Sequence, residues 1–518
     1  MEQAKRVAKN TGILYARMAI TVFLSLYITR LVLAALGTED FGTFNLVGGA
    51  IAMLSFLNGA MSSASQRFMS YAQGEGDHKK QKYIFNVSTL LHFFIAIAVV
   101  ILLELAGYFF FNGLLKIDPD RMYAAKIIYQ FLIVSTFFTV ISVPYDAVIN
   151  AHENMLFVAI TGIIESILKL GIAFYITYTN FDKLISYGLL MASLAILMLI
   201  IKRIYCHIKY EEVTINIRKY CDKDIFKEMT GFAGWSFLGS SSSLIANYGQ
   251  GIVLNIFFGT FVNAAQGISI QVNGQLSAFA TTMMKALNPV LAKSEGAGNR
   301  KLMIKASMMG SKVSFFMLTF FFIPILIETS YVFSLWLKEV PDFAVIFCQL
   351  LLIRNLIEQL FKTLASSISA QGKIKNYQIT SSILCYFPLI CSYYLFSIGF
   401  PAHTLYIVFI LYSIIASCII LYFAKRNFNF PVNIFLKEVV FKCLAVFTFI
   451  YLMAYIPYCL LEQGLIRLSL VTLTSSISYS IFIWFIGFSI KEREQLTFLI
   501  NPFVNKFCTF SLNNKKRK

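Results

Sequence analysis

The chain has 518 residues, 58% of them hydrophobic and only 14% charged, and its mean hydropathy is +0.70. A water-soluble fold of this length could not bury that much apolar surface, so the composition excludes a soluble protein and indicates an integral membrane protein. The formal charge of +18 does not indicate nucleic-acid binding, because the lysines and arginines fall between apolar runs and form no single basic face. We therefore expect membrane lipids among the partners of the chain and no nucleic acid.

Continuous apolar runs divide the chain into about fourteen predicted transmembrane helices. A hydrocarbon core about 30 Å thick requires about 20 apolar helical residues, whereas the strands of a membrane barrel would alternate apolar with polar. The predicted spans are 11–36, 41–66, 84–111, 123–150, 155–178, 184–205, 230–258, 261–286, 303–328, 342–370, 375–396, 402–424, 438–460 and 465–489. The fold class is therefore all-α, and the basic segment before the first span lacks a cleavage site, which predicts that the first helix is retained.

The distribution of positive charge predicts the orientation of these helices. Fourteen spans place both termini on one side, and about 29 lysines and arginines then fall on that side. The opposite side has only about four, namely Lys116, Arg121, Lys183 and Lys338. Because loops rich in lysine and arginine stay in the cytoplasm, we predict a multi-pass protein of the plasma (inner) membrane with both termini cytoplasmic. The nine cysteines have no paired spacing and the five histidines form no ligand motif, so neither disulfides nor a metal is expected.

The sequence also repeats itself at a residue-number interval of 222, as in transporters built from two related bundles. The stretch 31–37 resembles the stretch 253–259, and the same interval relates Gly74 to Gly296, Gly76 to Gly298 and Lys79 to Lys301. Farther along, an interval of 219 relates Ala151 to Ala370. The repeat predicts a six-helix lobe at 1–206, a cytoplasmic basic linker at 207–228, and a second six-helix lobe at 229–430. Helices 13 and 14 and a basic cytoplasmic tail follow at 431–518.

The first eighty residues contain the most specific motifs. They are AsnThrGly at Asn10, a first helix with Arg17 and Arg30, the segment LeuGlyThrGluAspPheGlyThrPheAsnLeuValGlyGly at 36–49, SerGlnArgPhe at 65–68 and AlaGlnGlyGluGlyAsp at 72–77. This pattern resembles the Wzx-type polysaccharide-unit flippases of the bacterial MOP (multidrug, oligosaccharidyl-lipid, polysaccharide) exporter superfamily, which have a MATE-like fold. The helix count and the two-lobe arrangement extend the resemblance over nearly the whole chain.

The resemblance implies a V-shaped pair of lobes around a central cavity that opens alternately to either side of the membrane. The implied cargo is an undecaprenyl-diphosphate-linked oligosaccharide, moved from the inner to the outer leaflet for assembly of surface polysaccharide or the O-antigen of lipopolysaccharide. The polysaccharide polymerase machinery would be a further partner. The resemblance implies no catalytic residue and no cofactor, with a proton or sodium gradient as a source of energy.

Arginines inside the predicted helices are the first candidates for binding the cargo, because an ionised side chain in a membrane marks a cavity, an ion pair or an interface. Arg17, Arg30 and Arg354 could each bind the diphosphate through the two parallel hydrogen bonds of a guanidinium group. The alternative for Arg17 is a side chain that extends to the nearby cytoplasmic surface. For Arg30 the alternative is pairing with Glu39 or Asp40. We expect Arg17 and Arg354 to face the same aqueous cavity between the lobes.

Acidic side chains inside the spans are candidates for binding a coupling proton or sodium ion. These are Asp146, Glu165 and Glu358. Structural pairing is the alternative for each, and the spacing favours it, because Glu165 precedes Lys169 by four residues and Glu358 follows Arg354 by four.

The seventh and eighth predicted helices are unusually polar. Asn247, Gln250, Gln271 and Gln275 exceed what helix packing usually requires, so we expect them to line a wet cavity that binds sugar hydroxyls. Hydrogen bonds that hold neighbouring helices together are the alternative.

Functions of other classes are weaker interpretations. A cation-coupled multidrug exporter of the same superfamily is the nearest alternative, but arginines inside the membrane favour an anionic cargo. A membrane glycosyltransferase or polymerase would need a larger outer domain than the short loop around AspProAsp at 118–120, and the sequence has no P-loop or GxSxG elbow. A purely structural membrane protein would not need the polar helix pair. We therefore predict that the chain is not an enzyme.

Overall fold

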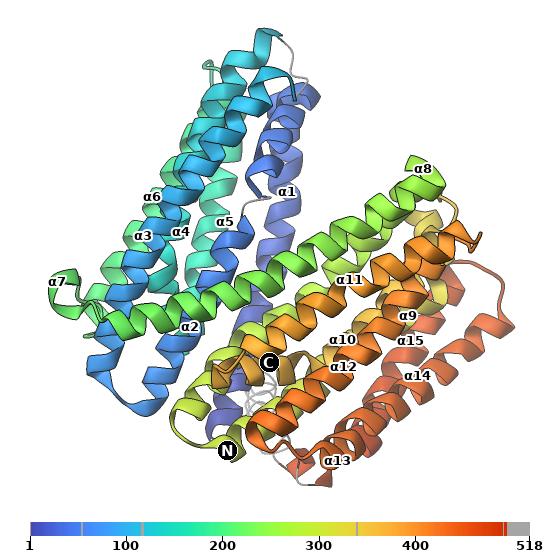
Figure 1. The fold of residues 1–518 in the computed structure, drawn as a ribbon. Helices are drawn as coiled ribbons and strands as arrows, with labels where there is room; N and C mark the ends of the chain where they lie inside the picture. Colours follow the sequence, from blue (N-terminus) through green and yellow to red (C-terminus); the bar gives the residue numbers. More distant parts are fainter. Residues whose placement is uncertain (1, 53–54, 115–118, 338–339, 491, 495–518) are drawn as a thin grey trace, which may run out of the picture.

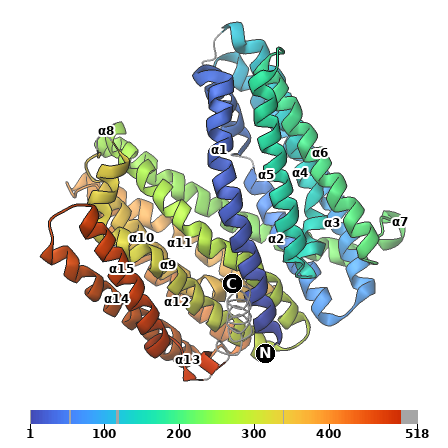
Figure 2. The same cartoon turned by 180° about the vertical axis from the view of Figure 1, so that it is seen from behind.

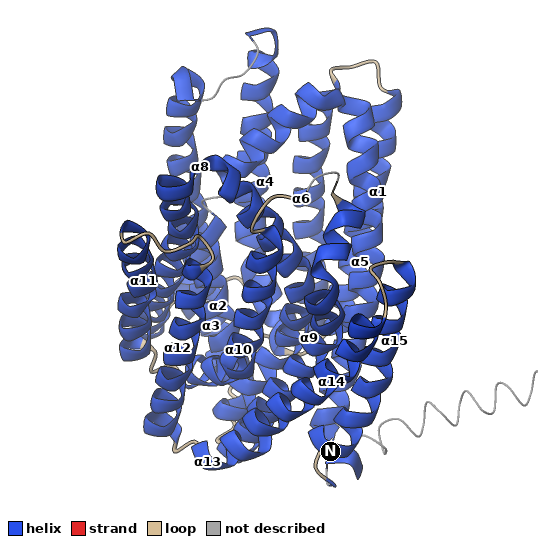
Figure 3. Cartoon of the chain, turned by 90° about the vertical axis from the view of Figure 1, so that its right-hand side faces the viewer, coloured by secondary structure: helices blue, strands red, loops and turns tan. Residues whose placement is uncertain are grey.

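Two helical bundles that diverge from a common end form the protein (Figure 1). The computed structural model describes residues 2–52, 55–114, 119–337, 340–490 and 492–494, and these residues form helices and connections without a strand (Figure 3). The first bundle consists of α1 (Glu2–Ala52), α2 (Ser55–Glu75), α3 (His78–Phe109) with a π-helical turn η1 (Phe110–Leu114), a short turn η2 (Pro119–Arg121), α4 (Met122–Ala151), α5 (Met155–Tyr178) and α6 (Lys183–Lys209). The predicted all-α fold is confirmed.

The second bundle follows a short connection that contains α7 (Ile217–Tyr220). It consists of α8 (Lys223–Gly296), α9 (Arg300–Trp336), α10 (Ala344–Gln371), α11 (Lys375–Ser397) and α12 (Thr404–Phe428). The view from behind shows α1 descending in front of the gap between the bundles (Figure 2). There Tyr15 of α1 donates a hydrogen bond to the carbonyl oxygen of Phe279 in α8, over 2.7 Å.

Two long helices are each broken at one glycine. Gly37 interrupts α1 with a φ of 78° and a ψ of 173°, and Gly259 interrupts α8 with a φ of 75° and a ψ of −173°. A positive φ of this kind is accessible to glycine and strained for residues with a Cβ atom. The two glycines are related by the interval of 222, so the predicted repeat reappears as the same backbone break in both bundles.

These breaks account for the number of transmembrane helices. Eleven helical segments are long and apolar enough to cross a membrane by length and composition. The breaks at Gly37 and Gly259 delimit the helical segments 38–52, 223–258 and 260–296, and these segments and α2, which are not among the eleven, overlap the predicted spans 41–66, 230–258 and 261–286. These segments are the more polar ones, and α2 and α8 pack against each other between the bundles. A protein interior tolerates polar side chains that lipid would not.

Matched caps extend the repeat. Asp77 caps α3 by accepting a hydrogen bond from the backbone N–H of Lys80, and Asn299, which the interval of 222 relates to Asp77, caps α9 in the same way. At the later interval of 219, Glu153 has a φ of 55° and Gly372 a φ of 91°. The predicted repeat therefore reappears in the backbone at these positions, while the residue limits given above for the lobes stay predictions.

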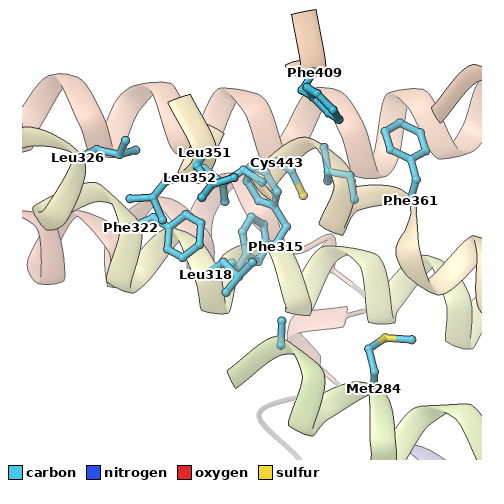
Figure 4. Close-up of a cluster of buried hydrophobic side chains, with 14 of the residues drawn as sticks. Met284, Phe315, Leu318, Phe322, Leu326, Leu351, Leu352, Phe361, Phe409 and Cys443 are labelled. Carbon is cyan, nitrogen blue, oxygen red and sulfur yellow. The ribbon is translucent and has the colours of Figure 1, made fainter. Parts of the chain in front are cut away.

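The last helices attach to the second bundle. They are α13 (Val432–Phe435), the π-helical turn η3 (Leu436–Val440), α14 (Phe441–Leu460), α15 (Leu465–Phe482) and the turn η4 (Ile483–Gly487). Figure 4 shows Cys443 of α14 close to Phe315 of α9 within the largest apolar core. Two ion pairs with buried members reinforce this attachment, Arg467 to Glu328 at 2.7 Å and Lys312 to Glu492 at 2.9 Å.

The bundles touch most closely where α2 and α8 end. A Cβ atom on Gly74 would overlap the carbonyl oxygen of Lys293, and a Cβ atom on Gly296 would overlap the carbonyl oxygen of Tyr71. The two contacts are related by the interval of 222, so the backbones cross symmetrically with no side chain between them. We call these two contacts the glycine crossing.

Cations extend across the same end of the molecule. Arg67 of the first bundle donates from Nε to the carbonyl oxygen of Ala370 in the second, over 3.1 Å. In the reverse direction, Lys293 lies 3.5 Å from the carboxylate of Glu153 at the end of α4. Cations are favourable at the C-termini of helices, so these contacts hold the two bundles together at this end.

Candidate functional site

A polar cavity of about 820 Å³ lies in the second bundle. Its walls come from α8, α10, α11 and α12, and α2 contributes two residues from the first bundle. Most of its polar lining residues carry hydroxyl or amide groups: Ser63, Ser236, Ser240, Ser243, Asn247, Ser366, Ser369, Tyr377, Gln378, Ser381, Ser382, Tyr412 and Ser413. We call this the second-bundle cavity.

Three charged side chains of α10 line this cavity, namely Arg354, Glu358 and Lys362. They are spaced four residues apart, and an α-helix places residues with this spacing on one face. The Nε atom of Arg354 donates to Oε1 of Glu358 over 2.7 Å, and the hydroxyl of Ser413 donates to the same oxygen over 2.9 Å. The guanidinium group also lies over the ring of Phe409, 4.7 Å from its centroid. Two cations and one anion leave the described lining with an excess of one positive charge.

A glycine on α8 shapes the wall opposite α11. A Cβ atom on Gly239 would overlap the side-chain amide of Gln378. Glycine at this position therefore lets Gln378 approach α8, and its amide remains part of the cavity lining.

The first bundle has a smaller cavity of about 240 Å³ between α4, α5 and α6. Its polar lining residues are Ser135, Thr139, Ser142, Glu165, Lys169 and Lys202. Lys169 pairs with Glu165 at 2.6 Å, and Lys202 pairs with Asp146 at 2.8 Å. We call this the first-bundle cavity. Its lining, like that of the second-bundle cavity, holds two cations and one anion, and Asp146, which pairs with Lys202, is not a lining residue.

The two cavities occupy equivalent places in the repeat. The interval of 219 relates Ser135 to Arg354 and Thr139 to Glu358, and each of these four residues lines the cavity of its own bundle. The repeat therefore supplies two polar cavities of the same origin, with Ser135 in one and Arg354 in the other at the equivalent position.

The predicted arginines are found in different environments. Arg354 lines the second-bundle cavity. Arg17 is half-buried and packs against Gly162 of α5, where a Cβ atom would overlap its guanidinium group, and it lines neither cavity. Because the side chain of Arg17 is directed toward α5, Arg17 and Arg354 do not line either of these two cavities together, and a central cavity shared by them stays a prediction.

Arg30 is exposed, and its anticipated pairing with Asp40 is wrong. Asp40 instead binds Arg121, whose guanidinium group also pairs with Asp182 at 2.8 Å. The side chain of Glu39, the other anticipated partner of Arg30, lies outside the described ones.

The predicted amide residues also lie in different environments. Asn247 lines the second-bundle cavity, and Gln250 is buried behind it and donates to the Asn247 side-chain oxygen over 3.2 Å. Gln271 and Gln275 are exposed on the second part of α8 and line neither cavity. Sequence reasoning missed Gln378, although the spacing of polar residues on α11 together with the interval of 219 could have pointed to that helix.

The acidic candidates all have cationic partners in the structure. Asp146 pairs with Lys202, Glu165 with Lys169, and Glu358 with Arg354. Their use as coupling-ion sites stays a prediction.

Comparisons with known proteins agree with this architecture. A family model described as MatE matches residues 16–175. An uncharacterized membrane protein of Bacillus subtilis (strain 168), EpsK, is 32% identical over 105 residues, a stretch that covers only 20% of this chain and 20% of that protein.

Solved structures match over a much larger part of the chain. A multidrug resistance MATE transporter of the MOP superfamily in an outward-facing conformation has a TM-score of 0.67 at 15% identity, over 81% of this chain and 95% of that one. A MATE protein in a bent conformation has a TM-score of 0.70 at 14% identity, over 82% and 96%. A MOP superfamily transporter from Pyrococcus furiosus, described as having a binding pocket of reverse polarity that suggests a different function, has a TM-score of 0.66 at 14% identity, over 83% and 96%.

The eleven long apolar helices define a multi-pass membrane protein. More specifically, the chain has the fold of the MATE transporters of the MOP superfamily. The matched family and these structures are transporters and not enzymes, as the sequence predicted.

Proposed function

We propose that the protein is a flippase that moves an undecaprenyl-diphosphate-linked oligosaccharide across the plasma membrane by alternating access. The cargo would supply surface polysaccharide or O-antigen assembly, and both termini would lie in the cytoplasm. The observation that carries the proposal is the second-bundle cavity, which combines an excess of positive charge with many hydroxyl and amide groups.

The charge of this cavity fits the diphosphate of the cargo. A group with about two negative charges cannot enter a medium of low dielectric constant without compensation. Arg354 engages Glu358 through Nε, and no hydrogen bond within the described residues occupies its other two nitrogens. These nitrogens form the fork that binds two phosphate oxygens side by side.

The hydroxyl and amide groups fit the sugars. Seryl hydroxyls both donate and accept hydrogen bonds, and side-chain amides do the same through separate atoms. Lining residues such as Ser240, Ser381 and Gln378 could therefore exchange hydrogen bonds with the hydroxyl groups of an oligosaccharide. A cavity for lipophilic drugs would instead be lined mainly by apolar and aromatic side chains.

A cation-coupled multidrug exporter remains the alternative, supported by the shared fold with a multidrug resistance transporter. The charges argue against it. An organic cation requires uncompensated acids, but Asp146 and Glu165 are each paired with a lysine, and Glu358 with an arginine.

Deletion of the gene in its host distinguishes the two functions. A flippase deletion removes the surface glycan and leaves lipid-linked oligosaccharide on the cytoplasmic side of the membrane, which can be extracted and quantified. Restoring the wild-type gene on a plasmid should reverse both effects. A deletion strain with a normal surface glycan and altered drug tolerance would contradict the proposal and favour the exporter.

A further inference from the structure

The carboxylate of Glu358 is the one acidic group among the described residues that line the second-bundle cavity. Its side chain is 46% exposed, whereas that of Arg354 is 14% exposed, so the carboxylate lies nearer to the open space than the guanidinium group that it binds. Oε1 accepts both hydrogen bonds described above, from Arg354 and from Ser413. An anion that binds Arg354 therefore lies beside the carboxylate of Glu358.

A like charge in this position opposes the binding of an anion. With Glu358 ionised, the three charged residues of α10 offer one net positive charge, although a diphosphate needs about two. At the effective dielectric constant of a partly buried site, two like charges about 6 Å apart repel each other enough to weaken binding roughly a hundredfold. Cargo binding at Arg354 is thus unfavourable as long as the carboxylate remains there.

Helical spacing gives the carboxylate a second cationic neighbour. Lys362 lies one turn beyond Glu358 and lines the same cavity, and positions four residues apart on a helix are within reach of each other. A change of side-chain rotamer at Glu358 would exchange Arg354 for Lys362 without movement of the helix. The carboxylate would remain paired, while the nitrogens of Arg354 become available.

We propose that Glu358 is an exchangeable counter-anion of the second-bundle cavity, which neutralises Arg354 when the cavity is empty and moves to Lys362 when a diphosphate binds Arg354. This inference rests on the proposed function for the identity of the cargo. It makes Glu358 a specificity-determining residue, because a weakly charged anion gains too little from Arg354 to displace the carboxylate. A diphosphate, with its higher charge and two neighbouring phosphate groups, does displace it.

Binding of inorganic pyrophosphate to the purified full-length protein tests this role without the native cargo. Glu358→Gln keeps the shape of the side chain and removes its charge, so we expect pyrophosphate to bind at least about fivefold more tightly to this variant than to the wild type. Arg354→Ala should abolish binding in both backgrounds. Glu438→Gln is the matched control, since it removes the acid of another ion pair between adjacent helical turns, that with Lys442, which lines neither cavity, and it should leave the affinity unchanged.

The role of Lys362 gives a second measurement. Lys362→Gln removes the position to which the carboxylate moves, so it should weaken pyrophosphate binding more in the wild-type background than in Glu358→Gln. Independent residues would instead show additive effects. The thermal unfolding midpoint of each purified variant identifies any that fail to fold.

A folded Glu358→Gln protein that binds pyrophosphate with equal or lower affinity than the wild type, or does not bind it at all, would overturn the inference, because a purely structural ion pair predicts that result. Failure of the proposed function is a separate outcome. If gene deletion leaves the surface glycan intact, the flippase is disproved, whereas tighter pyrophosphate binding by Glu358→Gln would still establish the counter-anion in an anion site.

Discussion

The two bundles share a backbone arrangement but place large and small side chains on opposite helices. The large side chain comes from the first helix of the first bundle, but from α11 in the second. In the first bundle, Arg17 of α1 packs over Gly162 of α5, whereas in the second bundle Gly239, the counterpart of Arg17 at the interval of 222, receives Gln378 from α11. Ser135 in the first cavity likewise corresponds to Arg354 in the second. Duplication thus preserved where each polar cavity forms, while substitutions within it left the second cavity larger and placed Arg354 in its wall.

The largest effect on transport should come from removing the charge of Arg354. Replacing Arg354 by alanine should lower glycan export at least about tenfold, because a hydrogen bond to a charged group contributes about 1.5–3 kcal/mol. Arg354→Lys should retain part of the activity, since it keeps the charge and loses the fork. Export is measured in cells that carry each variant at matched membrane abundance.

Two further variants make this result interpretable. The double variant Arg354→Ala, Glu358→Gln has no unpaired carboxylate at position 358. If it also loses export, the loss in Arg354→Ala does not come only from leaving Glu358 unpaired. Lys442→Ala removes one partner of another ion pair between adjacent helical turns, with Glu438, remote from both cavities, and should export normally. Normal export by Arg354→Ala would mean that the asymmetry of the cavities has no part in transport.

A second asymmetry lies in the helices that only the second bundle carries. Arg467→Ala leaves the carboxylate of Glu328 without its cationic partner and with no exposed surface, and breaking a buried ion pair in this way destabilises a protein by about 3–5 kcal/mol. We expect a clear fall in the thermal unfolding midpoint in detergent. The exposed Arg426 is the control, because its replacement by alanine should leave the midpoint unchanged.

At the glycine crossing, by contrast, substitution of either glycine should destabilise the protein to the same extent. Valine at Gly74 or at Gly296 would clash with backbone atoms, which cannot rotate away, so each change should destabilise the protein by about 1–3 kcal/mol. The test is thermal unfolding of the two variants side by side. Gly171→Val serves as the control because nothing lies within 4 Å of a Cβ atom there, and a large difference between Gly74→Val and Gly296→Val would contradict the symmetry.

The smallest effect concerns helix caps. Burial opposes ionisation of Asp182, but the hydrogen bonds from Arg121 and from the backbone of Ile185 outweigh it and lower the pKa of Asp182 below its usual value. A lowered pKa adds stability above the ordinary aspartate pKa of about 3.9, and that stability is lost as the pH falls from this value through the lowered pKa of the folded state. The loss should be less than about 1 kcal/mol for so exposed a pair.

Its measurement is the unfolding midpoint between about pH 6 and pH 3.5. Asp182→Asn should reduce the fall of the unfolding midpoint as the pH is lowered. Asp222→Asn, at the cap of α8, is the matched change in the second bundle, because Asp222 accepts only backbone hydrogen bonds among those described. Equal pH effects of the two variants would show that Arg121 contributes nothing.

Sequence alone predicted the fold well because its signals are local. Each apolar run is long enough to specify its own helix. At Gly37 and Gly259 the residue type itself permits the positive φ at which the helix breaks. The site was harder, since polarity does not reveal which way a helix faces. Gln271 and Asn247 are equally polar, yet only Asn247 lies on the side of α8 that meets α10, α11 and α12.

Pairings between distant residues were also beyond the sequence. Asp40 is close in sequence to Arg30, but its partner is Arg121, which belongs to another helix end 81 residues away. Only the packing of α1 against α4 and α6 brings them together. By contrast, Glu358 and Arg354 were expected to pair, because a helix fixes positions four residues apart.

The glycine crossing also has a mechanical consequence. The helical segment 260–296, which ends there, is about 55 Å long at the rise of an α-helix. A rotation of about 10° around this contact would therefore displace its far end by about 10 Å. No side chain lies between the backbones at the glycine crossing, so a rotation there would require no side-chain rearrangement at the contact. A small rotation at this end would therefore produce a large displacement at the other end of the helix.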